Sequence, residues 1–129
     1  MKKIAHPKRD QKFDTGAYSD AILTDGFLFV SGQASVDFET STFKLGSIEE
    51  ETRQTLENIK AIVEAAGGSM DHIVKCTVHL ADIKEFDRYN QVYASYFKET
   101  KPARITVQSV LAEGLKVEID CIARIPDAL

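Results

Sequence analysis

Arg104 and Glu118 are the two residues whose types and spacing most favour chemistry. Arg104 follows Pro102-Ala103 at the expected start of a strand, and a guanidinium can hold a carboxylate through two parallel hydrogen bonds. Glu118 lies in the next expected strand, where a carboxylate can orient a water molecule or transfer a proton. The same spacing also fits a purely structural interpretation, in which Arg104 forms a surface ion pair with Glu118 or Asp120.

Two further segments contain residue types suited to binding a small ligand. Ser31-Gly32-Gln33 ends an apolar, strand-like run, and Gly32 either lets a ligand approach the backbone closely or marks a β-bulge. Tyr18-Ser19 lies in a loop-like stretch, where the tyrosine hydroxyl either bonds a ligand or belongs to a packed surface aromatic.

The histidines and cysteines predict neither a metal site nor a disulfide. His72 and His79 are an odd number of positions apart at the two ends of one strand-like run, so they face opposite sides, and His6 lies in the N-terminal arm. Cys76 and Cys121 match no zinc or CxxC spacing. We therefore expect buried, free thiols in a reducing, cytoplasmic compartment.

Size and charge narrow the class of protein. The chain has 129 residues, which predicts one domain spanning 1–129. The net charge of −4 argues against nonspecific nucleic-acid binding, which needs clustered Lys and Arg. No stretch approaches the ~20 apolar residues that cross a bilayer, and residues 1–10 lack the apolar core of a secretory signal. We expect neither nucleic acid nor membrane as a partner.

Several local patterns predict the elements in the N-terminal half. Asp25-Gly26 favours a tight hairpin turn between the apolar runs 21–24 and 27–30. The run 27–30 is apolar at every position, which indicates a strand covered on both faces. Ser47 and Glu50 have the spacing of a capping box, which predicts a helix from Ser47 to about Gly67.

The C-terminal half predicts a second helix and three strands. The run 74–80 alternates in polarity. Its apolar residues are expected on one face, and they are Val74, Cys76, Val78 and Leu80. Asp82 is the expected N-cap of a helix with an aromatic stripe, and Pro102 prevents the helix from continuing. The stripe is typical of a core, and its members are Phe86, Tyr89, Tyr93 and Phe97. Strands are expected over 103–110 and 116–125.

This order predicts an α+β fold, a mixed sheet with two helices packed on one face. The other face should then carry the polar positions of the last strands. These positions are Lys75, Thr77, His79, Arg104, Thr106, Gln108, Glu118, Asp120 and Arg124. That face is either solvated or a polar interface between subunits that contains a site. The apolar run 27–30 favours the interface, because a partner subunit would cover its second face.

Several segments, in order along the chain, resemble the motifs of the RidA/YjgF family of imine deaminases. The matching segments are Gly16-Ala17-Tyr18-Ser19-Asp20-Ala21 (G-P-Y-S-x-A), Phe29-Val30-Ser31-Gly32-Gln33 (F-V-S-G-Q), Thr52-Arg53-Gln54-Thr55-Leu56-Glu57-Asn58-Ile59 (T-R-Q-x-L-x-N-I), Asn90-Gln91-Val92-Tyr93 with Tyr96-Phe97 (N-x-V-Y…Y-F), Pro102-Ala103-Arg104 (P-A-R) and Val117-Glu118-Ile119 (V-E-I). Each motif is short, but together they cover nearly the whole chain and are specific.

The resemblance implies a chorismate-mutase-like fold and a homotrimer with three sites between subunits. It also implies cofactor-independent hydrolysis of enamine and imine acids, such as 2-aminoacrylate and 2-iminopropanoate, to 2-keto acids and ammonia. In this family pattern Arg104 holds the substrate carboxylate and Glu118 positions water. The resemblance places the remaining residues around the substrate: Tyr18 and Ser31 border it, Asn90 supports the pocket, and backbone groups near Gly32 and Thr106 bond the imine nitrogen or water.

The sequence departs from the family pattern at Ala17, Asp20 and Ile105-Thr106, where many members have proline, glutamine and Ser-Cys. These changes leave the preferred substrate open. The alternatives are a deaminase acting on a larger enamine or imine, and a non-catalytic trimer that binds small carboxylates or acts as a chaperone or translation inhibitor. RNA cleavage is the least favoured, because the chain is acidic and predicts no basic groove.

Overall fold

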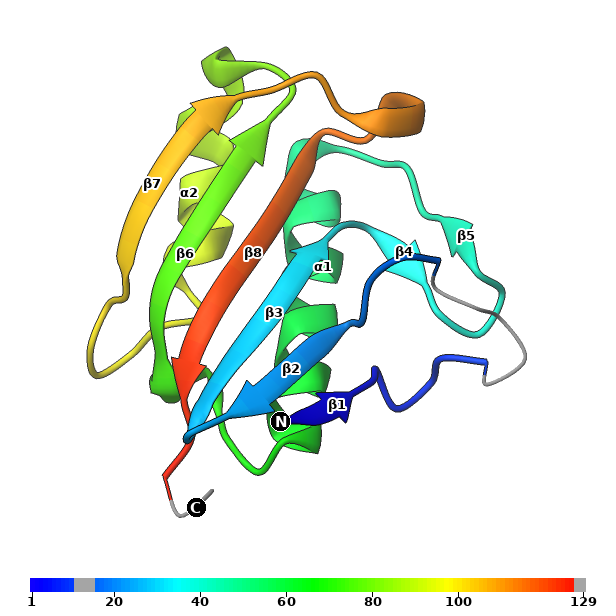
Figure 1. The fold of residues 1–129 in the computed structure, drawn as a ribbon. Coiled ribbons are helices and arrows are strands. Elements are labelled where there is room, and N and C mark those ends of the chain that lie inside the picture. The colour runs from blue at the N-terminus through cyan, green and yellow to red at the C-terminus, as the bar shows by residue number, and fades with distance from the viewer. Residues whose placement is uncertain (11–15, 127–129) are drawn as a thin grey trace.

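A computed structural model describes residues 1–10 and 16–126 and consists of one six-stranded sheet, one small ribbon and two helices (Figure 1). The sheet has the strand order β1-β2-β3-β8-β6-β7. Its strands are β1 (Lys2–Ile4), β2 (Ala21–Thr24), β3 (Phe27–Gln33), β8 (Val117–Arg124), β6 (Ile73–Leu80) and β7 (Ala103–Gln108). Only β6 and β7 run parallel, and the other neighbours in this sheet are antiparallel. The ribbon pairs β4 (Val36–Asp37) with β5 (Thr42–Phe43).

Both helices, α1 (Ile48–Ala65) and α2 (Phe86–Ala94), cover the same face of the sheet (Figure 1). Three single 3₁₀ turns complete the described part of the chain: η1 (Met70–His72), η2 (Ile83–Glu85) and η3 (Ala112–Gly114). The core lies between the helices and the sheet, and it includes the fully buried Leu28, Leu56, Ile59, Val78 and Ile119. The expected mixed sheet with two helices on one face is therefore confirmed.

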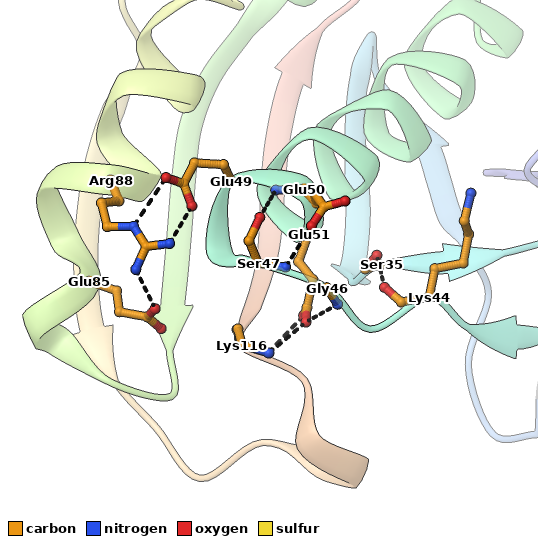
Figure 2. Close-up of polar contacts among 10 residues, drawn as sticks. All are labelled: Ser35, Lys44, Gly46, Ser47, Glu49, Glu50, Glu51, Glu85, Arg88 and Lys116. Carbon is orange, nitrogen blue, oxygen red and sulfur yellow. Dashed lines mark hydrogen bonds and ion pairs between the residues drawn. The ribbon is translucent and has the colours of Figure 1, made fainter.

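The start of α1 is fixed by the predicted capping box and by a buried glutamate. The Ser47 hydroxyl accepts from the Glu50 amide at 3.1 Å, and the Glu50 carboxylate accepts from the Ser47 amide at 2.9 Å (Figure 2). The fully buried Glu51 carboxylate accepts from the backbone amides of Gly46, at 3.1 Å, and Lys116, at 2.8 Å. Its ion pair with the Lys116 ammonium, at 3.3 Å, ties the first turn of α1 to the start of β8. The sequence patterns did not single out Glu51.

Asp25-Gly26 forms the predicted hairpin between β2 and β3. Both residues have positive φ, 52° and 79°, which is the requirement of a type I′ turn.

The aromatic stripe lies in the core as predicted. Tyr89, Tyr93 and Phe97 are buried, and Phe86 packs against them at the edge. Asp82 caps a different element from the one expected, since its carboxylate accepts from the Lys84 amide and so begins η2, which precedes α2.

Val74 is not on the core face, contrary to the alternation expected for the run 74–80. The pairing of β6 with β8 shifts register between Ile73 and Lys75, so a bulge at Val74 reverses the alternation. Ile73 takes the buried place instead, and Val74 is exposed.

The last two strands do not pair with each other, because β6 lies between β7 and β8. In the parallel pairing, Arg104 is level with Cys76, and directly paired residues project to the same face of a sheet. Because Cys76 faces the helices, Arg104 faces them too. The same register places Thr106 beside Val78 and Gln108 on this face, so the expectation that these three residues lie on the uncovered face was wrong.

The uncovered face is a mixed surface. Phe27 and Phe29 of β3 are 40% and 46% exposed there, while Leu28 and Val30 are buried against the helices. Ile105 of β7 is on the same face and is half exposed. One chain therefore covers only one side of the apolar run 27–30.

Both cysteines are buried and free, as predicted. No helix in the described part of the chain is long and apolar enough to cross a membrane.

Candidate active site

Arg104 lies in an aromatic cradle formed by α2. Its guanidinium carbon is 5.4, 5.6 and 4.7 Å from the ring centroids of Phe86, Tyr89 and Tyr93, all within cation–π range. Its Nη1 donates to the Asn90 side-chain oxygen at 2.6 Å. The helical spacing that builds the core stripe therefore also positions this arginine.

The positive charge of Arg104 has no carboxylate partner among the described residues. Its hydrogen-bonding partner Asn90 is neutral. Burial raises the pKa of Tyr89 and Tyr93, so both phenols stay protonated beside the guanidinium. The alternative of a surface ion pair with Glu118 or Asp120 was wrong, because β6 separates β7 from β8 and Arg104 projects from the other face.

Thr106 lies two residues beyond Arg104 on the same face of β7. Its hydroxyl and the Tyr89 hydroxyl are hydrogen-bonded at 2.8 Å. Arg104, Asn90 and Thr106 thus form one group between β7 and α2, which we call the arginine group.

Glu118 lies on the uncovered face of β8, against β3. A Cβ atom added at Gly32 would lie only 2.8 Å from Glu118 Oε1, so the glycine leaves the space that this carboxylate occupies. The pairing of β3 with β8 shifts register between Val30 and Gln33, which confirms a bulge at this point. The bulge interpretation of Gly32 is therefore confirmed, and the group that lies against its backbone within this chain is the Glu118 carboxylate.

Ser31 anchors the loop that carries Tyr18. Its hydroxyl donates to the Ser19 carbonyl at 2.5 Å, and its amide donates to the Asp20 carbonyl at 2.9 Å. Tyr18 itself is more than half exposed.

Tyr18, Gly32 and Glu118 line one cavity of about 310 Å³. Glu118 forms no ion pair within the described residues, so its carboxylate faces this space unneutralised. We call this cavity with its three residues the glutamate pocket. Arg9 also lines it, and no spacing in the sequence pointed to Arg9 as a site residue.

The arginine group and the glutamate pocket do not meet within one chain. They project from opposite faces, and β6 lies between their strands, which is about 10 Å across the sheet. Arg104 is also level with Cys121, three residues along β8 from Glu118, which adds about 10 Å. A ligand of a few atoms bound to one group within the same chain cannot touch the other.

The histidines occupy separate surroundings. His6 stacks on Phe38, His72 accepts from the Ser69 amide, and His79 is hydrogen-bonded to Ser109. The described residues contain no group of three His, Cys, Asp or Glu side chains arranged to hold a metal ion.

Comparison with known proteins decides the family. The sequence profile of the family described as endoribonuclease L-PSP matches residues 10–125, which is most of the chain. The chain belongs to this family, which includes RidA and YjgF.

Relatives in this family are similar along most of their length. A RutC family protein of Pyrococcus horikoshii is 49% identical over 95% of this chain and 98% of its own. The human 2-iminobutanoate/2-iminopropanoate deaminase is 39% identical over 84% of this chain and 80% of its own. The crystal structure of E. coli TdcF with bound serine superposes with a TM-score of 0.86 at 34% identity, over 96% of this chain and 98% of TdcF. These structures confirm the fold that the motifs implied.

Proposed function

We propose that this protein hydrolyses reactive enamine and imine acids of the 2-aminoacrylate and 2-iminopropanoate type to 2-keto acids and ammonia. The observation that carries the proposal is a pair of oppositely charged groups, Arg104 and Glu118, neither of which has an ionic partner among residues 1–10 and 16–126. A 2-imino acid presents a carboxylate and an electrophilic C=N carbon. The first suits a guanidinium, and the second needs a positioned water molecule and proton transfer.

The reaction balances without any added reagent. Arg104 binds the substrate carboxylate, and Glu118 orients water and accepts one of its protons as the oxygen attacks the imine carbon. That proton is delivered to the nitrogen, which gives a carbinolamine. A second proton then moves from the carbinolamine hydroxyl to the nitrogen through Glu118 as the C–N bond breaks, so ammonia leaves and the carbonyl forms. No step requires a metal or an organic cofactor.

The separation of the two groups supports a site shared between subunits. A second copy of the chain brings its arginine group to the glutamate pocket of the first, and cyclic symmetry repeats this contact in a homotrimer with three sites. The exposed Phe27, Phe29 and Ile105 on the uncovered face favour such an assembly, because a partner subunit would bury them.

The names of relatives agree with this reaction. Three mammalian relatives, from rat, human and cow, are named 2-iminobutanoate/2-iminopropanoate deaminase. TdcF was crystallised with serine, which has the same carboxylate and α-nitrogen as an imino acid. The family description also names an endoribonuclease, but the net charge of −4 gives a phosphate backbone little attraction.

The test is hydrolysis of 2-iminopropanoate generated in place from alanine by an amino-acid oxidase, in competition with a semicarbazide trap. We expect wild type to divert the imine from the trap. Arg104→Lys keeps the charge but loses the planar guanidinium that binds a carboxylate through two hydrogen bonds, so kcat/KM should fall about 100-fold. The kcat/KM of Arg104→Ala should fall at least as far.

Sedimentation should give the same assembly for wild type and both variants, which separates loss of chemistry from loss of structure. Full activity in Arg104→Lys would refute the carboxylate clamp. Inactive wild type on small and bulky imino acids alike would favour a trimer that only binds carboxylates.

A further inference from the structure

The glutamate pocket extends well beyond the residues assigned to the reaction. Past Glu118 and Gly32, its wall is formed by apolar side chains from the β4–β5 ribbon with the residues beside it, and from the segment after η3. These are Ala34, Val36, Phe38, Phe43 and Leu115. The wall therefore combines one reactive carboxylate, Glu118, with an apolar surface.

The size of the cavity exceeds the needs of a methyl side chain. About 310 Å³ is at the lower end of the range for small-molecule sites, and one water molecule takes about 30 Å³. A substrate with a methyl side chain leaves the apolar wall against water. A larger apolar side chain removes that surface from water and gains about 25 cal/mol for each Å² buried.

The charges in the glutamate pocket disfavour a substrate with a charged side chain. Arg9 donates two hydrogen bonds to the Asp20 carboxylate, at 2.6 and 2.5 Å, so this cation is already neutralised. Asp20 is buried and also accepts from the His6 amide at 2.9 Å. Among the described residues that line the pocket, Glu118 is then the one charged side chain without an ionic partner. It would repel an acidic side chain, and it would bind a basic one in place of the reacting group.

The same ion pair makes the wall rigid. It holds the N-terminal arm, residues His6 to Arg9, against the pocket. The arm encloses Phe38, because the His6 ring stacks on it at 4.0 Å and the Arg9 guanidinium lies 4.8 Å from its centroid.

We propose that this site prefers imino and enamino acids whose side chain is neutral, apolar and larger than methyl, and that the β4–β5 ribbon and the clamped N-terminal arm set this preference. The inference rests on the proposed deaminase function and specifies its substrate class.

The experiment compares imines generated from alanine, leucine and glutamate, with semicarbazide competition as the readout of kcat/KM. Wild type should use the leucine-derived imine about tenfold better than the alanine-derived one, and the glutamate-derived imine least well. Val36→Phe fills the pocket and should lower the leucine-to-alanine ratio about tenfold. Leu45→Phe adds the same ring outside this pocket, at an exposed position, and should leave the ratio unchanged.

A second variant tests the same preference in case Val36→Phe folds poorly. Phe43→Ala enlarges the pocket at a half-exposed position, and it should shift preference from the leucine-derived towards the phenylalanine-derived imine. Wild type that prefers the alanine-derived imine, or a ratio that falls equally in Leu45→Phe, would overturn the inference and leave the deaminase assignment standing. Hydrolysis of none of these imines would instead overturn the proposed function itself.

Discussion

Arg104 has an unpaired charge because its neighbours are aromatic rings and an amide. Three rings of α2 and the Asn90 oxygen hold the guanidinium, and none of them carries a negative charge. A guanidinium held in this way keeps donors free for a ligand while its side-chain entropy is already reduced. This favours recognition of a carboxylate over a structural ion pair.

His6 is a second residue whose surroundings determine its chemistry. Its ring is buried against Phe38, and its Nδ1 accepts from the Lys8 amide at 3.1 Å. Burial lowers the pKa of His6 below its ordinary value of about 6.5, because the charged imidazolium loses its hydration. Nearby Asp20 opposes this shift without cancelling it.

We predict that the free energy of unfolding falls as pH falls below about 6.5, since the unfolded chain then binds a proton that the folded chain resists. The contribution of His6 is present in full above that pH and is lost as pH falls through the lowered folded value. Urea unfolding of wild type and His6→Gln between about pH 5 and 7.5 measures it. The variant should show a smaller slope, and equal slopes would exclude His6 as the source.

At the scale of elements, the first turn of α1 joins three parts of the chain. Glu51 receives hydrogen bonds from the loop before the helix and from the start of β8, the strand that carries Glu118 (Figure 2). Glu51 therefore holds the residue that precedes β8 against the first turn of α1.

Glu51→Ala should lower the free energy of unfolding by about 3 kcal/mol, because two partly buried amides and the Lys116 ammonium lose their acceptor. Denaturant unfolding measures this loss. Glu64→Ala, which changes an exposed glutamate near the end of the same helix, is the matched control and should be nearly neutral. If both variants lose the same stability, the contacts of Glu51 contribute nothing beyond helix propensity.

In the whole molecule, Arg104 and Glu118 must come together for one substrate to contact both. One chain places the arginine group and the glutamate pocket on opposite faces with a strand between them. The proposed trimer makes each site from the arginine group of one subunit and the glutamate pocket of the next.

Mixed trimers test this arrangement directly. Arg104→Ala and Glu118→Gln should each be inactive alone. Equal amounts unfolded and refolded together should recover about a quarter of wild-type activity, because each mixed cyclic trimer contains one site with both residues intact. Recovery should be absent when either variant is refolded alone. No activity in the mixture, despite mixed trimers by mass spectrometry, would place each site within a single chain.

The sequence by itself determined the elements whose signals are local. Helical spacing identified the aromatic stripe of α2. The Ser47-Glu50 capping box predicted the start of α1, and Asp25-Gly26 predicted the hairpin turn between β2 and β3. Each of these signals depends on residues within a few positions of one another. The family motifs also identified the fold, since they extend over nearly the whole chain.

Only the tertiary structure decided which residues share a face. Alternation along one strand cannot reveal the bulge at Val74, and it cannot reveal that β6 separates β7 from β8. The register of β7 on β6, which pairs Arg104 with Cys76, placed Arg104 against α2 instead of beside Glu118. The ion pair of Arg9 with Asp20 could not be predicted either, because it joins two segments that only the fold brings together, and no repeating sequence pattern marks such a contact. Register and strand order arise from packing between distant segments, and a local pattern carries no information about them.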